Sequence, residues 1–97
     1  MDIETKLNEV AEEYETLERR LSDPELLSRP SEYQRVAKRH SDMEELIAKF
    51  RAWRKARRDR AEALELLRDA DDEIAAMARA ERDDAEARIA ALEEDIR

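Results

Sequence analysis

The sequence predicts an all-α protein: an elongated antiparallel bundle of three main helices, coiled-coil-like, with a short extra helical turn. Apolar residues recur at alternating spacings of four and three, which is the period of one helix face. Charged residues make up 47% of the chain and aromatic residues 4%, while Ala and Leu supply most of its 41% hydrophobic content. Such a composition is typical of long helices packed along narrow seams and excludes a large globular core.

The first helix is expected over about residues 2–21. Its apolar positions follow the helical spacing without a slip, and strand-like alternation does not compete. We predict that this stripe forms the structural seam of the helix, with the residues Leu7, Val10, Tyr14, Leu17 and Leu21.

The chain has no glycine and two prolines, so the prolines mark its breaks. Asp23 before Pro24 has the order of an N-cap and a first helical residue, which predicts a short turn of helix over 24–27. After Pro30, Ser31 and Gln34 have capping-box spacing, and they predict the start of a much longer helix.

The long helix is expected over about residues 31–68, unbroken because it contains no further proline. Its predicted seam residues are Phe50, Trp53, Leu64 and Leu67. Three consecutive acids, residues 71–73, suit the positive N-terminal end of a helix dipole. The last helix is therefore expected over about 71–97, and the whole chain, 1–97, as a single helical domain.

Composition also indicates the cellular location of the protein. Without cysteine it forms no disulfide, which fits a reducing cytosol. No apolar run approaches the roughly 20 residues that cross a bilayer, and the acidic N-terminal segment is not a secretory signal. We expect a cytoplasmic protein without a membrane partner.

One basic band lies inside an otherwise acidic chain of net charge −8. Residues 49–60 hold seven basic residues and one acid. Within this band, Arg51, Arg54, Lys55 and Arg58 share one flank of the expected helix. They either contact RNA phosphates or pair with acids of a neighbouring helix. Composition alone favours internal pairing, and it favours Trp53 as a core residue over a base-stacking platform.

No residue pattern predicts an enzyme. A catalytic carboxylate needs burial to shift its pKa, and long solvated helices offer none. His40 is the only histidine, too few for a metal site with converging ligands. We therefore expect no catalytic residue, no metal, no cofactor and no small-molecule ligand.

Short motifs around the prolines resemble the N-terminal domain of bacterial class I peptide chain release factors. Residues 21–25 read Leu-Ser-Asp-Pro-Glu, residues 29–33 read Arg-Pro-Ser-Glu-Tyr, and Lys38 follows. Residues 71–78 are similar to the acidic start of that family's next helix. The Glu-Tyr pair at 32–33 looks more like the type that reads UAA and UAG.

The resemblance implies a module that docks a termination factor on the ribosome. Its implied partners are the stalk-base protein of the large subunit, nearby ribosomal RNA, and the GTPase that recycles the factor. The candidate contact residues are then those of the basic band. The codon-reading tripeptide and the Gly-Gly-Gln loop of the family are not found in residues 1–97.

A second hypothesis remains open, namely a stand-alone coiled-coil module that homodimerises through residues 3–21. The two proline breaks argue against it, because they reverse the chain twice and suit an intramolecular bundle.

Overall fold

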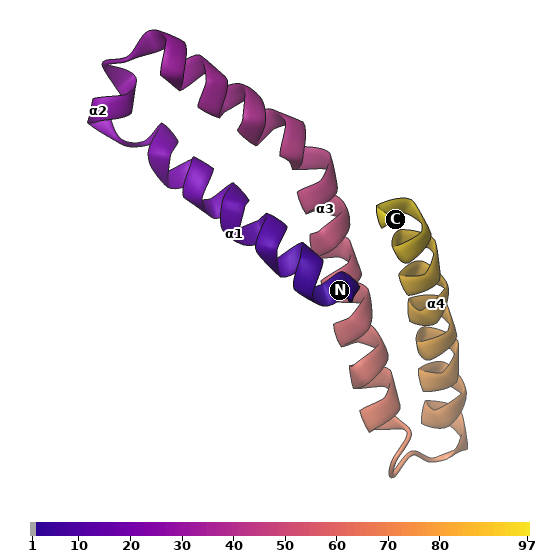
Figure 1. The fold of residues 1–97 in the computed structure, drawn as a ribbon. Coiled ribbons are helices and arrows are strands. Elements are labelled where there is room, and N and C mark those ends of the chain that lie inside the picture. Colours follow the sequence, from indigo (N-terminus) through magenta and orange to yellow (C-terminus); the bar gives the residue numbers. More distant parts are fainter. Residues whose placement is uncertain (1) are drawn as a thin grey trace. The chain divides into compact units, whose positions relative to one another are not determined.

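The computed structural model describes residues 2–97 (Figure 1). Its helices are α1 (Ile3–Leu21), α2 (Pro24–Leu27), α3 (Pro30–Leu66) and α4 (Asp72–Ile96). Residues 2–97 contain no strand, so the predicted all-α class is confirmed. α3 runs for 37 residues without interruption, as expected from the absence of glycine and proline inside it.

Aspartate side chains cap three of the helices. Asp2, Asp23 and Asp71 accept hydrogen bonds from the backbone N–H groups of Thr5, Glu25 and Ile74, respectively. Each bond satisfies an amide that the first helical turn leaves without a partner. The two breaks of the chain are thus fixed by local residue chemistry.

The start of α3 differs from the expected capping box. Pro30 is its first residue, and the amide of Tyr33 bonds the carbonyl of Arg29 at 2.9 Å. The expected Ser31 cap is therefore wrong, because Ser31 lies inside the first turn. Proline suits this first position, since its missing N–H would have had no helical partner.

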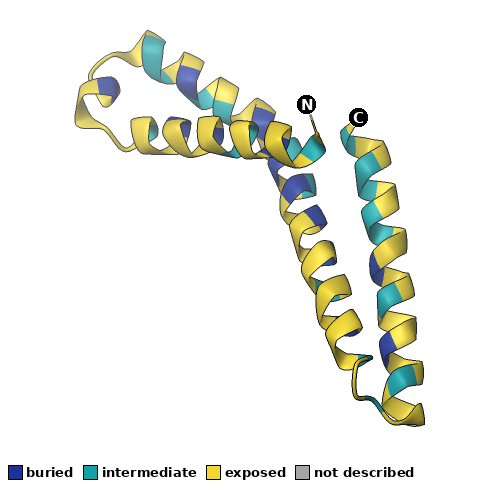
Figure 2. Ribbon diagram, turned by 60° about the horizontal axis from the view of Figure 1, so that its bottom comes forward, coloured by how far each residue is buried: buried dark blue, intermediate teal, exposed yellow. Residues whose placement is uncertain are grey.

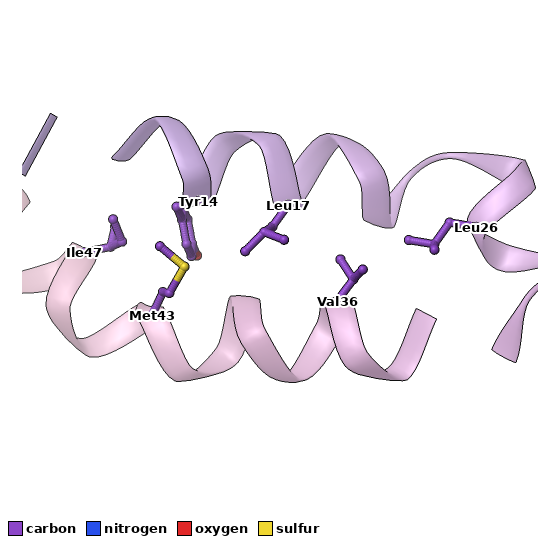
Figure 3. Close-up of a cluster of buried hydrophobic side chains, with 6 residues drawn as sticks. All are labelled: Tyr14, Leu17, Leu26, Val36, Met43 and Ile47. Carbon is purple, nitrogen blue, oxygen red and sulfur yellow. The ribbon is translucent and has the colours of Figure 1, made fainter. Parts of the chain in front are cut away.

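The chain divides into two compact units, and residues 1–48 form the first. In it α1 lies antiparallel to the first part of α3, and α2 closes one end (Figure 1). Figure 3 shows the buried cluster between them, to which all three helices contribute: Tyr14, Leu17, Leu26, Val36, Met43 and Ile47. The stripe read from the sequence of α1 therefore faces this cluster.

Residues 49–97 form the second unit, in which α4 runs antiparallel to the rest of α3. Alanines supply most of the buried positions in its seam, and the other two buried residues are Phe50 and Trp53. Figure 2 shows that most of the ribbon of these helices is not buried. Ala56 and Ala63 on α3, and Ala78 and Ala85 on α4, are each 0% exposed. Both pairs are seven residues apart, so small side chains repeat along one stripe of each helix. Small side chains allow two helices to approach closely, which makes this seam narrow.

Candidate functional site

The four predicted contact residues of the basic band, Arg51, Arg54, Lys55 and Arg58, are all exposed on the part of α3 in the second unit. Phe50 and Trp53 lie beside these cations on the helix and are each only 2% exposed. A continuous α-helix holds the four cations on one flank at spacings of three, one and three. This surface is called the cationic face below.

Two guanidinium groups cover the buried aromatic rings. Arg54 Cζ lies 4.4 Å from the centre of the Phe50 ring, and Arg57 Cζ lies 4.7 Å from that of Trp53. Cation–π attraction holds these arginines in place without removing their charge. The rings themselves are covered and offer no platform on which a nucleic-acid base could stack.

Trp53 is also joined to α4. Its indole Nε1–H donates to Glu93 Oε1 over 3.1 Å, and its ring lies 6.1 Å from that of Phe50, centre to centre. A buried indole N–H needs an acceptor, and Glu93 supplies it from the facing helix. The residue is therefore a structural anchor of the second unit.

Within the cationic face, Asp59 engages the ammonium group of Lys55. Lys55 Nζ lies 2.9 Å from Asp59 Oδ2, and Arg88 of α4 reaches the same oxygen at 3.0 Å. Arg88 also contacts Asp84 at 3.0 Å. The hydrogen bonds from Lys55 and then Arg88 lower the pKa of Asp59 below its ordinary value, because both favour the ionised carboxylate.

The pKa of the Arg88 guanidinium is raised in turn, first by its hydrogen bond to Asp59. A further pair, Arg60 Nε and Glu86 Oε1 at 3.2 Å, crosses from α3 to α4 on the other side of the seam. The sequence alone did not identify Asp59, Arg60, Glu86 and Arg88 as cross-helix partners. The antiparallel register of α3 and α4 identifies these partners. The contacts Trp53–Glu93, Asp59–Arg88 and Arg60–Glu86 all follow this one register.

The predicted seam residues of the first helix lie on one stripe of α1. Leu7, Tyr14 and Leu17 are buried, and Val10 and Leu21 are half-buried. Leu67, just beyond α3, is half-buried as well.

Leu64 was predicted in the seam, but the structure places it outside. Its side chain is 41% exposed, whereas the adjacent Ala63 is 0% exposed. Trp53, Ala56, Ala63 and Leu67 form the stripe that faces α4, and Leu64 lies one position past it. Leucine is larger and more apolar than alanine, which is why the sequence predicts Leu64 in the seam. The two helices lie so close together that only a small side chain fits between them, and Ala63 occupies this position.

His40 lies in the first unit against α1. Its ring stacks on Tyr14 with centres 4.2 Å apart, and its Nε2 lies 3.3 Å from Glu18 Oε1. Glu44 Oε1 is 3.7 Å from the other ring nitrogen. Among residues 2–97, no three histidine or carboxylate side chains converge in a way that could hold a metal ion. The described helices also include none that is long and apolar enough to cross a membrane.

Comparisons with known proteins identify the family. Residues 10–97 match the model of the PCRF domain. Peptide chain release factor 1 of Oleidesulfovibrio alaskensis is 38% identical over 92 residues, which is 95% of this chain and 26% of the relative. The release factor 1 proteins of Syntrophus aciditrophicus and Thermus thermophilus are 40% and 42% identical, over 96% and 94% of this chain.

This chain spans about a quarter of the length of these curated relatives. No solved structure matches it. Because the family model covers most of its length, the chain belongs to the PCRF domain family, and its sequence is of the bacterial peptide chain release factor 1 type that residues 21–25 and 29–33 indicated.

Proposed function

We propose that this helical domain is a non-catalytic module of a translation termination factor, which docks the factor on the ribosome in the cytoplasm. The proposed position is near the stalk base of the large subunit, where the stalk-base protein and nearby ribosomal RNA are the partners. The GTPase that recycles the factor is a further proposed partner. The family membership supports termination, and the resemblance supports the position and the partners.

The cationic face is the single observation that carries the proposed RNA contact. The chain has a net charge of −8, so most of its surface repels phosphate. Arg51, Arg54 and Arg58 are exposed at spacings that align them along α3. Guanidinium groups aligned in this way bind phosphate oxygens and release counterions from RNA. Lys55 lies on the same face, where Asp59 engages its ammonium group.

A triple variant tests this contact: Arg51→Gln, Arg54→Gln and Arg58→Gln. We expect weaker binding of the chain to isolated large ribosomal subunits in a sedimentation assay. The binding should also depend less on salt, because each lost phosphate contact makes the negative slope of log K against log salt shallower by about 0.7–0.9. Far-UV circular dichroism shows whether the variant keeps its helices.

The matched control removes the same number of positive charges from exposed positions of the first unit: Arg19→Gln, Arg29→Gln and Lys38→Gln. It has the same net charge, so nonspecific attraction to the ribosome falls equally. If the cationic face contacts RNA specifically, the triple variant of the cationic face should lose clearly more affinity for the subunit than the control. Its binding should also lose more of its salt dependence. Equal losses, or none, contradict the proposal.

Dimerisation through residues 3–21 is not favoured as a function. That hypothesis needs the apolar stripe of α1 as an exposed surface. Instead, Leu7, Tyr14 and Leu17 are buried within a single chain, where Tyr14 and Leu17 contribute to the cluster with α2 and α3.

A further inference from the structure

A groove of about 580 Å³ runs between α3 and α4 within the second unit. Asp59 and Glu62 line it from α3, and Met77, Glu81, Asp84 and Arg88 line it from α4. Four carboxylates thus face one guanidinium, so the groove is acidic. We call this side of the second unit the acidic flank.

Large apolar side chains are exposed at one end of the acidic flank. Met77 is 55% exposed, and Leu66 and Ile74 are 48% and 40% exposed. Leu66 follows Asp59 by seven residues, and Ile74 precedes Glu81 by seven. Because seven residues are nearly two helical turns, Leu66 and Ile74 continue the stripes of the groove toward the end of the helix pair.

The alanine seam explains why these side chains are uncovered. Ala63 and Ala78 are too small to extend beyond the line of contact between the two helices, so a pair of helices alone has nothing to cover the flank. Met77 is a flexible side chain that adapts to different contact shapes. Exposed apolar residues grouped in this way mark a surface that a partner covers.

The carboxylates of the groove differ in how far they are already engaged. Asp59 and Asp84 contact Arg88. The carboxylates of Glu62 and Glu81 have no hydrogen bond or ion pair with another residue in the described part of the chain. They sit on opposite walls of the groove, one on each helix, where they can meet cations of a partner between them.

We propose that the acidic flank binds a basic amphipathic helix of another protein, which lies along the groove as a third helix. Its apolar side chains would cover Leu66, Ile74 and Met77, and its Lys or Arg side chains would meet Glu62 and Glu81. Helices that pack in grooves present anchors at spacings of three and four, which matches the spacing on both walls. Charges beside such a seam select the partner.

Two other occupants fit the flank less well. RNA is repelled by four carboxylates. A second copy of the chain offers basic residues on its cationic face, but the aromatic neighbours of that face, Phe50 and Trp53, are buried. The cationic face of a second copy therefore offers no aromatic side chain that could cover Met77.

The test uses a labelled helical peptide of about 18 residues, or five turns, with Leu on one face and Lys beside it. Its counterpart carries Glu in place of each Lys. In fluorescence anisotropy, the Lys peptide should bind the chain and the Glu peptide should not. The double variant Glu62→Gln, Glu81→Gln and the single variant Met77→Ser should each weaken binding by about three- to tenfold.

Two matched variants of the first unit serve as controls. Glu12→Gln with Glu15→Gln removes two exposed carboxylates, and Leu27→Ser alters a leucine that is 55% exposed, as Met77 is. Both should bind the Lys peptide like the parent. The proposal is overturned if the controls lose as much affinity as the flank variants, or if both peptides bind equally. It is also overturned if sedimentation shows that the flank variants abolish self-association. Arg51, Arg54 and Arg58 are unchanged in all these variants, so the result is independent of the ribosome-binding test.

Discussion

Replacing Trp53 with alanine should destabilise the second unit severely. The side chain is 2% exposed, hydrogen-bonded to Glu93 and covered by Arg57. Large-to-small changes of buried aromatic residues cost about 3–5 kcal/mol. A domain of this size has about 5–15 kcal/mol of stability in total, so the loss would be at least about a fifth of it.

A conservative variant separates packing from hydrogen bonding. Trp53→Phe keeps most of the buried ring but loses the indole N–H, and this bond contributes about 1 kcal/mol. Urea denaturation followed by far-UV circular dichroism measures both variants against the parent. We expect the midpoint to fall modestly for Trp53→Phe and strongly for Trp53→Ala.

Leu64→Ala is the matched control, because Leu64 is a large apolar residue on the same helix but is 41% exposed. Its cost should stay within about 0.5 kcal/mol, as for other surface changes. An unchanged midpoint for Trp53→Ala would refute the buried anchor. A loss for Leu64→Ala equal to that for Trp53→Ala would refute the assignment of the seam to Ala63.

Two further predictions concern the seam and its ion pairs. Ala63→Leu should cost about 1–3 kcal/mol, because a larger side chain separates the two helices, whereas Ala61→Leu at an exposed position should cost little in the same urea titration. Asp59→Asn tests the lowered pKa of Asp59: a carboxylate with a lowered folded pKa stabilises the fold above its unfolded pKa, and this contribution disappears as pH falls through the folded pKa. Thermal melts should therefore show the variant below the parent near neutral pH and equal to it in acid below the lowered folded pKa of Asp59. An identical gap at every pH would contradict the ion pair.

The helix breaks were predictable because they depend on neighbouring residues only. Asp23 with Pro24, and the acids from residue 71, specify their helix starts through side chains a few positions away. The stripe of α1 was equally clear, since large apolar residues repeat there without a slip. Such signals need no knowledge of the partner helix.

The seam of the second unit was harder to predict because the residues of α3 that lie in it depend on how α4 is aligned with α3. Alanine is compatible with both a seam and a surface, so Ala63 and Leu64 could not be ranked without α4 in place. The cross-helix pair of Arg60 and Glu86 depends on the turn between the two helices, whose geometry fixes which residues face each other. Composition predicted ion pairs between these helices, but it could not specify that Asp59 is shared between Lys55 and Arg88.

The helix ends in the first unit have a consequence for how the chain reverses. Ser22 and Ser28, which follow α1 and α2, keep right-handed helical angles, with φ −96° and −79°, and none of residues 2–97 has a positive φ. No left-handed cap stops either helix. The stop comes from proline rings, which disfavour the helical conformation of the residue before them, as the extended Asp23 shows at ψ 122°.

Two pyrrolidine rings therefore separate the folded-back hairpin from a continuous helix. With alanine in place of Pro24 and Pro30, α1, α2 and α3 would be free to continue as one straight rod. The stripe of α1 would then find its complement on the α3 of another molecule, as in a domain-swapped dimer. The prolines thus keep the first unit a folded-back hairpin rather than an intertwined assembly.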